Sequence, residues 1–130
     1  MAMVRELKSV VMTSERPEAL AAFYREILFL PFEKEQHKGT EPHWACQFGA
    51  QHFAIHHPRG FWLPSVGQEP ATATFLSFTI ESLEPFVAHL ERAGVEVLAR
   101  TQIGPMQFVS FRDPDGRRVS CGTPWPEKRR

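Results

Sequence analysis

The side chains best suited to chemistry gather in one short region of the chain, which holds four histidines. His43 and His52 are followed by the adjacent pair His56 and His57. An imidazole titrates near physiological pH and is a common metal ligand, so it can act as a general acid or base or hold a divalent cation. Because side chains alternate along a strand, we expect His52, Ala54 and His56 on one face. His52 and His56 are therefore the candidate catalytic residues.

Other side chains are suited to binding a ligand rather than reacting with it. Trp44, Trp62 and Trp125 offer flat apolar surfaces, and Trp62 stands in a loop-like segment of the kind that often closes over bound molecules. Packing is the favoured interpretation, in the core for Trp44 and over an edge for Trp125, and less so for Trp62. Ser110 lies within a strand pattern, where its hydroxyl could orient a ligand.

Three arginines crowd the last turn expected in the chain: Arg112, Arg117 and Arg118. A solvated hairpin tip is the favoured interpretation, and the reception of an anionic substrate is the alternative. The chain has no Ser-His-Asp order, phosphate-binding loop or dinucleotide-binding glycine motif. The candidate chemistry is therefore limited to the histidines.

Composition narrows the possible partners. Lys+Arg and Asp+Glu balance at 15 each, which disfavours nucleic-acid binding. No apolar stretch approaches the roughly 20 residues that a membrane helix needs. Cys46 and Cys121 are far apart in apolar runs, so we expect buried thiols in a reducing compartment. These observations predict a cytoplasmic protein with neither nucleic acid nor membrane as a partner.

Hydrophobic periodicity indicates the elements that position these side chains. Each half of the chain is expected to contain a strand, a helix and three further strands, the last two forming a hairpin. Gly49-Ala50 marks the first hairpin turn, and Asp113-Pro114-Asp115-Gly116 marks the second. The expected elements are strands at 7–14, 32–36, 73–80 and 95–100, helices at 14–30 and 81–94, and hairpins at 43–58 and 106–122.

The two halves also repeat at the level of residues. Shifting the first half by about 66 positions aligns "SVVMTSERPEALAAFY" with "FLSFTIESLEPFVAHL", so that Thr13 meets Thr79 and Glu18 meets Glu84. Such a repeat indicates internal duplication. We expect a single domain over residues 1–130, made of a module at 5–58 and a module at 71–125 joined by a linker at 59–70.

Duplicated modules that end in a "DPDG" hairpin resemble the vicinal oxygen chelate superfamily, which includes glyoxalase I, bleomycin-resistance proteins and extradiol dioxygenases. The resemblance covers about residues 5 to 125 and is carried by "AAFYREIL" and "FRDPDGRRVS". It implies an α+β fold of two paired βαβββ modules, whose curved mixed sheets form a half-open barrel cavity. It also implies a homodimer.

In metal-dependent members of the superfamily, each module supplies one ligand from its first strand and one from its last. The resemblance places these positions at Ser9 and Phe75 and at Ala54 and Ser120. Alanine and phenylalanine cannot bind a divalent cation, and serine is a weak ligand. No metal cofactor is therefore expected, and the chain resembles the metal-free branch of the superfamily.

A shift of two residues in the first module would change this expectation, because His56 would then replace Ala54. His43 on the preceding strand could join His52 and His56 in a displaced metal site. This is the alternative in which a divalent metal is bound.

Two functions of different class follow. One is a binding protein for a small, partly apolar or aromatic molecule; the other is a lyase, isomerase or dioxygenase that uses a displaced histidine metal site or a metal-free histidine base. Whether the protein is an enzyme stays open at this point, as does a purely structural or regulatory module. The expected cavity is lined by Ser9, His43, Trp44, His52, Ala54, His56, Trp62, Phe75, Ser110 and Ser120.

Overall fold

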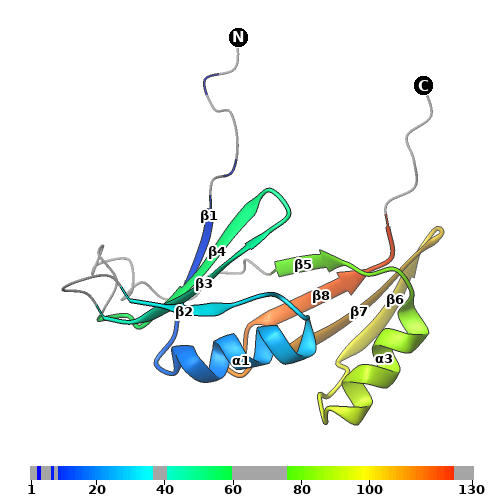
Figure 1. Cartoon of the computed structure of the whole chain (residues 1–130). Coiled ribbons are helices and arrows are strands. Elements are labelled where there is room, and N and C mark those ends of the chain that lie inside the picture. The colour runs from blue at the N-terminus through cyan, green and yellow to red at the C-terminus, as the bar shows by residue number, and fades with distance from the viewer. Residues whose placement is uncertain (1–2, 4–6, 8, 37–40, 60–75, 125–130) are drawn as a thin grey trace. The chain divides into compact units, whose positions relative to one another are not determined.

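The chain folds into two compact units, Met1–Pro70 and Ala71–Arg130, which we call module 1 and module 2. A computed structural model describes residues 3, 7, 9–36, 41–59 and 76–124. Within these residues, each module contains one helix and one four-stranded mixed sheet (Figure 1). Apart from Arg59, the expected linker lies outside the described residues.

The first strand of module 1 runs parallel to the strand that comes last in the module's sequence. The elements are β1 (Ser9–Thr13), α1 (Pro17–Ile27), β2 (Glu33–Glu35), β3 (His43–Phe48) and β4 (Gln51–His56). The strand order is β1-β4-β3-β2. β3 pairs antiparallel with both β2 and β4, and Gly49, with a φ of 59°, provides the tight turn between β3 and β4.

Module 2 repeats this plan. Its elements are β5 (Leu76–Thr79), α3 (Leu83–Arg92), β6 (Ala99–Ile103), β7 (Met106–Arg112) and β8 (Arg118–Gly122). The strand order is β5-β8-β7-β6, with β5 parallel to β8 and the other pairs antiparallel. Neither sheet closes on itself. The predicted α+β fold of two βαβββ modules is confirmed.

In each module the helix packs against one face of that module's sheet. Leu20 and Tyr24 of α1 are fully buried, as is Leu90 of α3. The rings of Phe86 on α3 and Phe111 on β7 lie 6.1 Å apart. This packing distinguishes the two faces of each sheet, and we call the face turned away from the module's own helix the distal face.

The two sheets share one pairing register. Val11 pairs with Ala54 in module 1, and Ser77 pairs with Ser120 in module 2. Each residue of the second pair therefore lies 66 positions after its equivalent in the first. In the hairpins, Ala45 pairs with Ala54, and Ser110 pairs with Ser120. Ala54 is thus equivalent to Ser120, and the pairing shows no slip that would bring His56 to that place.

The "DPDG" turn is held by the buried carboxylate of Asp113. Its Oδ1 accepts hydrogen bonds from the backbone N–H groups of Asp115 and Arg117, at 2.9 and 3.0 Å. Its Oδ2 lies 3.3 Å from Arg117 Nη1. Gly116 has a φ of 87°, a value that favours glycine. The motif therefore builds the hairpin.

The strand predicted at 95–100 is displaced, because the observed strand β6 begins at Ala99. The N–H of Val95 donates to the carbonyl of Leu90, and the N–H of Gly94 donates to that of Glu91. These two hydrogen bonds are the pattern that ends a helix at a glycine in the left-handed conformation, here Gly94 with a φ of 73°. Val95 is thus part of the helix terminus and is not available for a strand.

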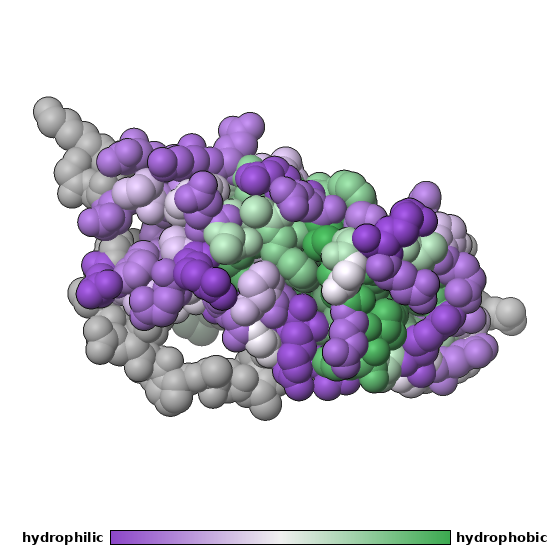
Figure 2. Space-filling view, turned by 90° about the horizontal axis from the view of Figure 1, so that it is seen from below, coloured by the Kyte–Doolittle hydropathy of each residue, from purple (hydrophilic) through white to green (hydrophobic). Residues whose placement is uncertain are grey.

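Hydrophilic side chains cover much of the molecular face in Figure 2, with apolar residues between them. Among the described residues, Val11 and Phe48 are apolar side chains of the module 1 sheet that remain exposed.

Both cysteines are buried and free, and burial raises the pKa of Cys121 to about 12. Neither helix of the described residues has the length and apolar character to cross a membrane.

Candidate functional site

The distal face of module 1 carries a row of polar side chains at one end of its sheet. Thr13 pairs with His56 on the neighbouring strand, and Glu35 pairs with His43. The rings of His43 and His56 stack at 4.4 Å with an interplanar angle of 7°. His43 Nε2 lies 3.1 Å from Glu35 Oε1, so the imidazole N–H donates to the carboxylate. Glu35, His43 and His56 thus form a chain in which a hydrogen bond joins the first two groups and ring stacking joins the last two.

His56 is the titratable group that this arrangement changes most clearly. Its partial burial lowers the pKa, because a charged ring is poorly solvated there. Nearby His43 and His52 lower the pKa further, whereas the carboxylate of Glu35 opposes the shift. His56 is therefore neutral at neutral pH and can accept a proton.

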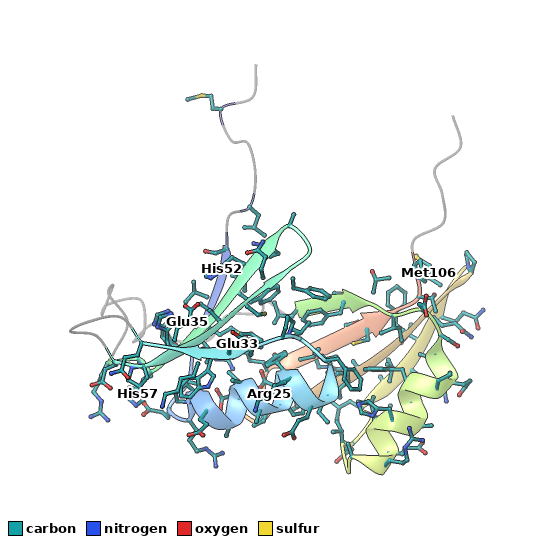
Figure 3. All side chains as sticks on the ribbon, viewed as in Figure 1. Arg25, Glu33, Glu35, His52, His57 and Met106 are labelled. Atoms are coloured by element: carbon teal, nitrogen blue, oxygen red, sulfur yellow. The ribbon has the colours of Figure 1, made fainter. Side chains whose placement is uncertain are left out.

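The other two histidines of the region lie towards opposite ends of β4. His52 pairs with Ser9 near the β3–β4 turn, and His57 follows the last residue of the strand (Figure 3). His57 Nε2 lies 3.3 Å from Glu15 Oε2, and its Nδ1 accepts a hydrogen bond from the backbone N–H of Arg59. His57 thus has local partners outside the stacked pair.

The distal face of module 2 has a different character, because hydroxyl groups surround a hollow of about 340 Å³. Ser77, Ser120, Ser110 and Ala99 follow one another across the four strands of the sheet. Apolar carbon contributes to the hollow as well. The full lining is Ser77, Ala99, Thr101, Phe108, Val109, Ser110, Arg118 and Ser120.

The cation of this hollow is Arg118, which the sequence suggested as part of a solvated hairpin tip. Its Nη2 donates to Ser110 Oγ at 3.0 Å. Arg118 lies two residues before Ser120 on the same strand, so strand alternation places both on one face. This two-residue spacing was the feature of the sequence that could have indicated Arg118 as a residue of the hollow.

Phe108 and Gly122 pack closely at one end of the hollow. They are cross-strand partners, and a Cβ added to Gly122 would lie 2.5 Å from a ring carbon of Phe108. Under the same pairing register, these positions correspond to His43 and His56 of module 1. A stacked imidazole pair in one module thus takes the place of a phenyl ring over glycine in the other.

Of the four positions that the resemblance assigned to metal ligands, Ser9, Ala54 and Ser120 are described, and Phe75 lies outside the described residues. The described three offer two hydroxyls and a methyl group, which do not fit a divalent cation. Within the described parts of the chain, no three or more His, Cys, Asp or Glu side chains are placed to hold a metal. The displaced trio of His43, His52 and His56 is not arranged as such a site.

Trp44 is separated from the other expected cavity residues. It lines a depression beside α1 with Pro17 and Ala22, and Lys34 Nζ lies 6.0 Å from the centre of its ring. This is the helix-covered face, whereas the adjacent His43 points to the distal face. Trp62 and Trp125 lie outside the described residues. For the remaining residues, the binding role stays a prediction.

The comparison with known families covers both modules. Residues 9–121 match the family model of the glyoxalase-like domain. The chain belongs to the glyoxalase-like domain family. This family and the matching fold place the chain in the vicinal oxygen chelate superfamily. No curated protein matches the sequence significantly.

Solved structures with this glyoxalase-like fold include proteins with different described roles. A lactoylglutathione lyase from Agrobacterium tumefaciens is 16% identical, with a TM-score of 0.70 and coverage of 94% of this chain and 96% of that one. The antibiotic-binding protein TnmS3 from a Streptomyces species is 13% identical, with a TM-score of 0.72 and coverage of 96% and 100%. A glyoxalase family protein from Enterococcus faecalis is 21% identical, with a TM-score of 0.67 and coverage of 93% and 99%. At these identities the similarity shows the fold.

Proposed function

We propose that this glyoxalase-like protein binds a small, partly apolar or aromatic molecule at a distal face, without a metal at the usual positions of the superfamily. The observation that carries the proposal is the hollow of module 2, which combines the ring of Phe108 with a row of serines. Apolar walls with a few placed polar groups are typical of small-molecule sites. Serine and alanine, where the superfamily's metal-dependent members carry ligands, support binding without metal chemistry.

The antibiotic-binding role of TnmS3 supports the same proposal, since the two chains share the fold. A fold can host unrelated chemistries, so the residues of the site carry more weight than this similarity. Aromatic antibiotics, glutathione adducts and short 2-oxo acids are the first compounds to test.

A thermal-shift screen of the untagged protein, with metal analysis of the same preparation, tests the proposal. A ligand that binds the folded protein raises its melting temperature. We expect an apolar or aromatic compound to do so, and Phe108→Ala to reduce the shift while Phe48→Ala at the tip of the other hairpin leaves it unchanged. Stoichiometric metal, or no response to any compound with an apolar part, would overturn the proposal.

A second candidate function follows from the chain of Glu35, His43 and His56. The imidazole of His56, whose pKa is kept low by burial and by His43, is neutral and can accept a proton as a general base. We propose as the alternative a lyase or isomerase in which His56 removes a proton from the bound molecule. This alternative needs no metal.

Proton exchange tests the alternative directly. Any carbonyl compound found in the screen is incubated with the protein in deuterium oxide, and loss of its α-proton signal is followed by NMR. Wild-type protein and His57→Gln should catalyse the exchange, and His56→Gln should not. If His56→Gln exchanges as fast as wild type, His56 is not the base.

We also propose that the protein forms a homodimer and acts in the cytoplasm, as expected from the superfamily and from the cysteine usage. Light scattering should then give a mass twice the 14.9 kDa of one chain. A mass equal to one chain would overturn the proposed dimer.

A further inference from the structure

Arg118 differs from Arg100 and Arg117 in having no carboxylate partner, and its cross-strand partner Arg112 donates to the carbonyl of Gly116 at the hairpin turn. Arg100 forms an ion pair with Glu84, and Arg117 forms one with Asp113. Within the described residues, Arg118 forms no ion pair and instead donates to the hydroxyl of a serine. Its positive charge is therefore not neutralised by the side chains that the structure describes around it.

The hydrogen bond to Ser110 leaves further donors free in the hollow. Because Ser110 Oγ accepts from Arg118, its own proton is available to another acceptor, as are the remaining N–H groups of the guanidinium. Ser77 and Ser120 also line the hollow, and neither side chain hydrogen-bonds to another group in the described residues. The hollow thus combines several hydrogen-bond donors with the positive charge of Arg118.

The lining of the hollow contains no acidic side chain. Apolar surface from Ala99 and Phe108 lies beside the donors. An anion with an apolar body would match both parts. A guanidinium binds planar oxyanions through parallel N–H bonds, and a single arginine matches the single charge of a carboxylate better than the higher charge of a phosphate.

We propose that module 2 binds the carboxylate group of an aromatic or apolar organic acid, with Arg118 as its charge partner and Ser110, Ser120 and Ser77 as hydroxyl donors. This inference rests on the proposed function and narrows the ligand to monocarboxylic acids. The apolar part of the acid then lies against Phe108. Nothing in this arrangement requires a covalent step.

Matched ligand pairs test the inference. Aromatic and aliphatic carboxylic acids, such as 2-naphthoate, are titrated by calorimetry alongside their neutral amides, with inorganic phosphate as a separate arm. We expect the acids to bind wild-type protein at least about tenfold more tightly than the amides, since hydrogen bonds to charged groups are the stronger ones. Arg118→Gln should remove this difference, and higher salt should reduce it.

Arg100→Gln is the matched control, because Arg100 lies on β6 between Ala99 and Thr101 of the hollow and is paired with Glu84. It should bind the acids as wild type does. Equal affinity for acids and amides would overturn the carboxylate inference and leave the proposed apolar binding intact. Equal losses in the two arginine variants, binding of phosphate alone, or no binding of any acid would also overturn it. The proposed function is tested separately, because it is overturned if no compound with an apolar part raises the melting temperature in the thermal-shift screen.

Discussion

The distal faces of the two modules share a backbone plan and differ in chemistry. At one end of the sheet, module 1 has His43 stacked on His56, where module 2 has Phe108 over Gly122. The difference extends to the middle row. There, module 1 has Val11, Ala54 and Ala45, and module 2 has serines on the three equivalent strands.

Equivalent positions thus differ in the chemistry that they offer. Module 1 places titratable groups beside an apolar row, which suits proton transfer. Module 2 places a permanent cation, Arg118, beside hydroxyl groups, which suits the binding of an anion. The position of Arg118 corresponds to that of His52 in module 1, because equivalent residues of the two sheets are 66 positions apart in the sequence. Once a duplicated framework is stable, its two copies can specialise side chain by side chain.

The largest expected effect concerns the helix-covered faces, where the modules also differ. Phe111 is fully buried against Phe86, and the equivalent position in module 1 is Cys46. We expect Phe111→Ala to lower the free energy of unfolding by about 3–5 kcal/mol. Cys46→Ala should lower it by about 1 kcal/mol, because far less apolar surface is lost. Urea denaturation measures both, and equal losses would show that the two cores do not depend on these positions differently.

A smaller effect is expected where the phenyl ring replaces the imidazole pair. Gly122→Ala brings a methyl group against the ring of Phe108, so we expect a loss of about 1–3 kcal/mol in the free energy of unfolding. Removing the ring in Phe108→Ala should relieve most of this loss, and the double variant should therefore be non-additive. Additive losses would mean that the close approach is not what makes glycine necessary.

The smallest expected effect is the titration of His56, which has no counterpart in module 2. Its pKa is lowered in the folded protein by burial and by His43, so the unfolded chain takes up this proton more readily. The contribution to stability is therefore present above the ordinary histidine pKa of about 6.5 and is lost as the pH falls below it.

Histidine NMR titrations measure this shift directly. His43→Gln should raise the pKa of His56 towards its ordinary value, and Glu35→Gln should lower it further, since Glu35 opposes the shift. Shifts in the same direction for the two variants would contradict the proposed chain of groups.

Much of the fold was predictable because its causes are local. Hydrophobic periodicity indicated the strand–helix–strand–strand–strand order, and the repeat indicated which positions of the two modules correspond. The separation of His43 from Trp44 followed from strand alternation alone, although the sequence analysis placed both in one cavity. The late start of β6 was not evident, because the helix terminus takes up Val95 through a backbone bond to Leu90.

The contacts that give each site its chemistry depend on strands distant in sequence. Nothing near His43 in the chain predicts that its imidazole meets Glu35 and His56, because the register of three strands brings them together. The same holds for Arg118 and Ser110, which meet across a hairpin.

The sequence by itself thus determined the duplicated α+β plan, the family and the side chains available at each position. Those features depend on local periodicity and on residue identity. Only the tertiary structure decided that one module holds a stacked imidazole pair and the other an arginine among serines. Cross-strand register and the face covered by each helix result from packing across the whole module, which no short stretch of sequence specifies.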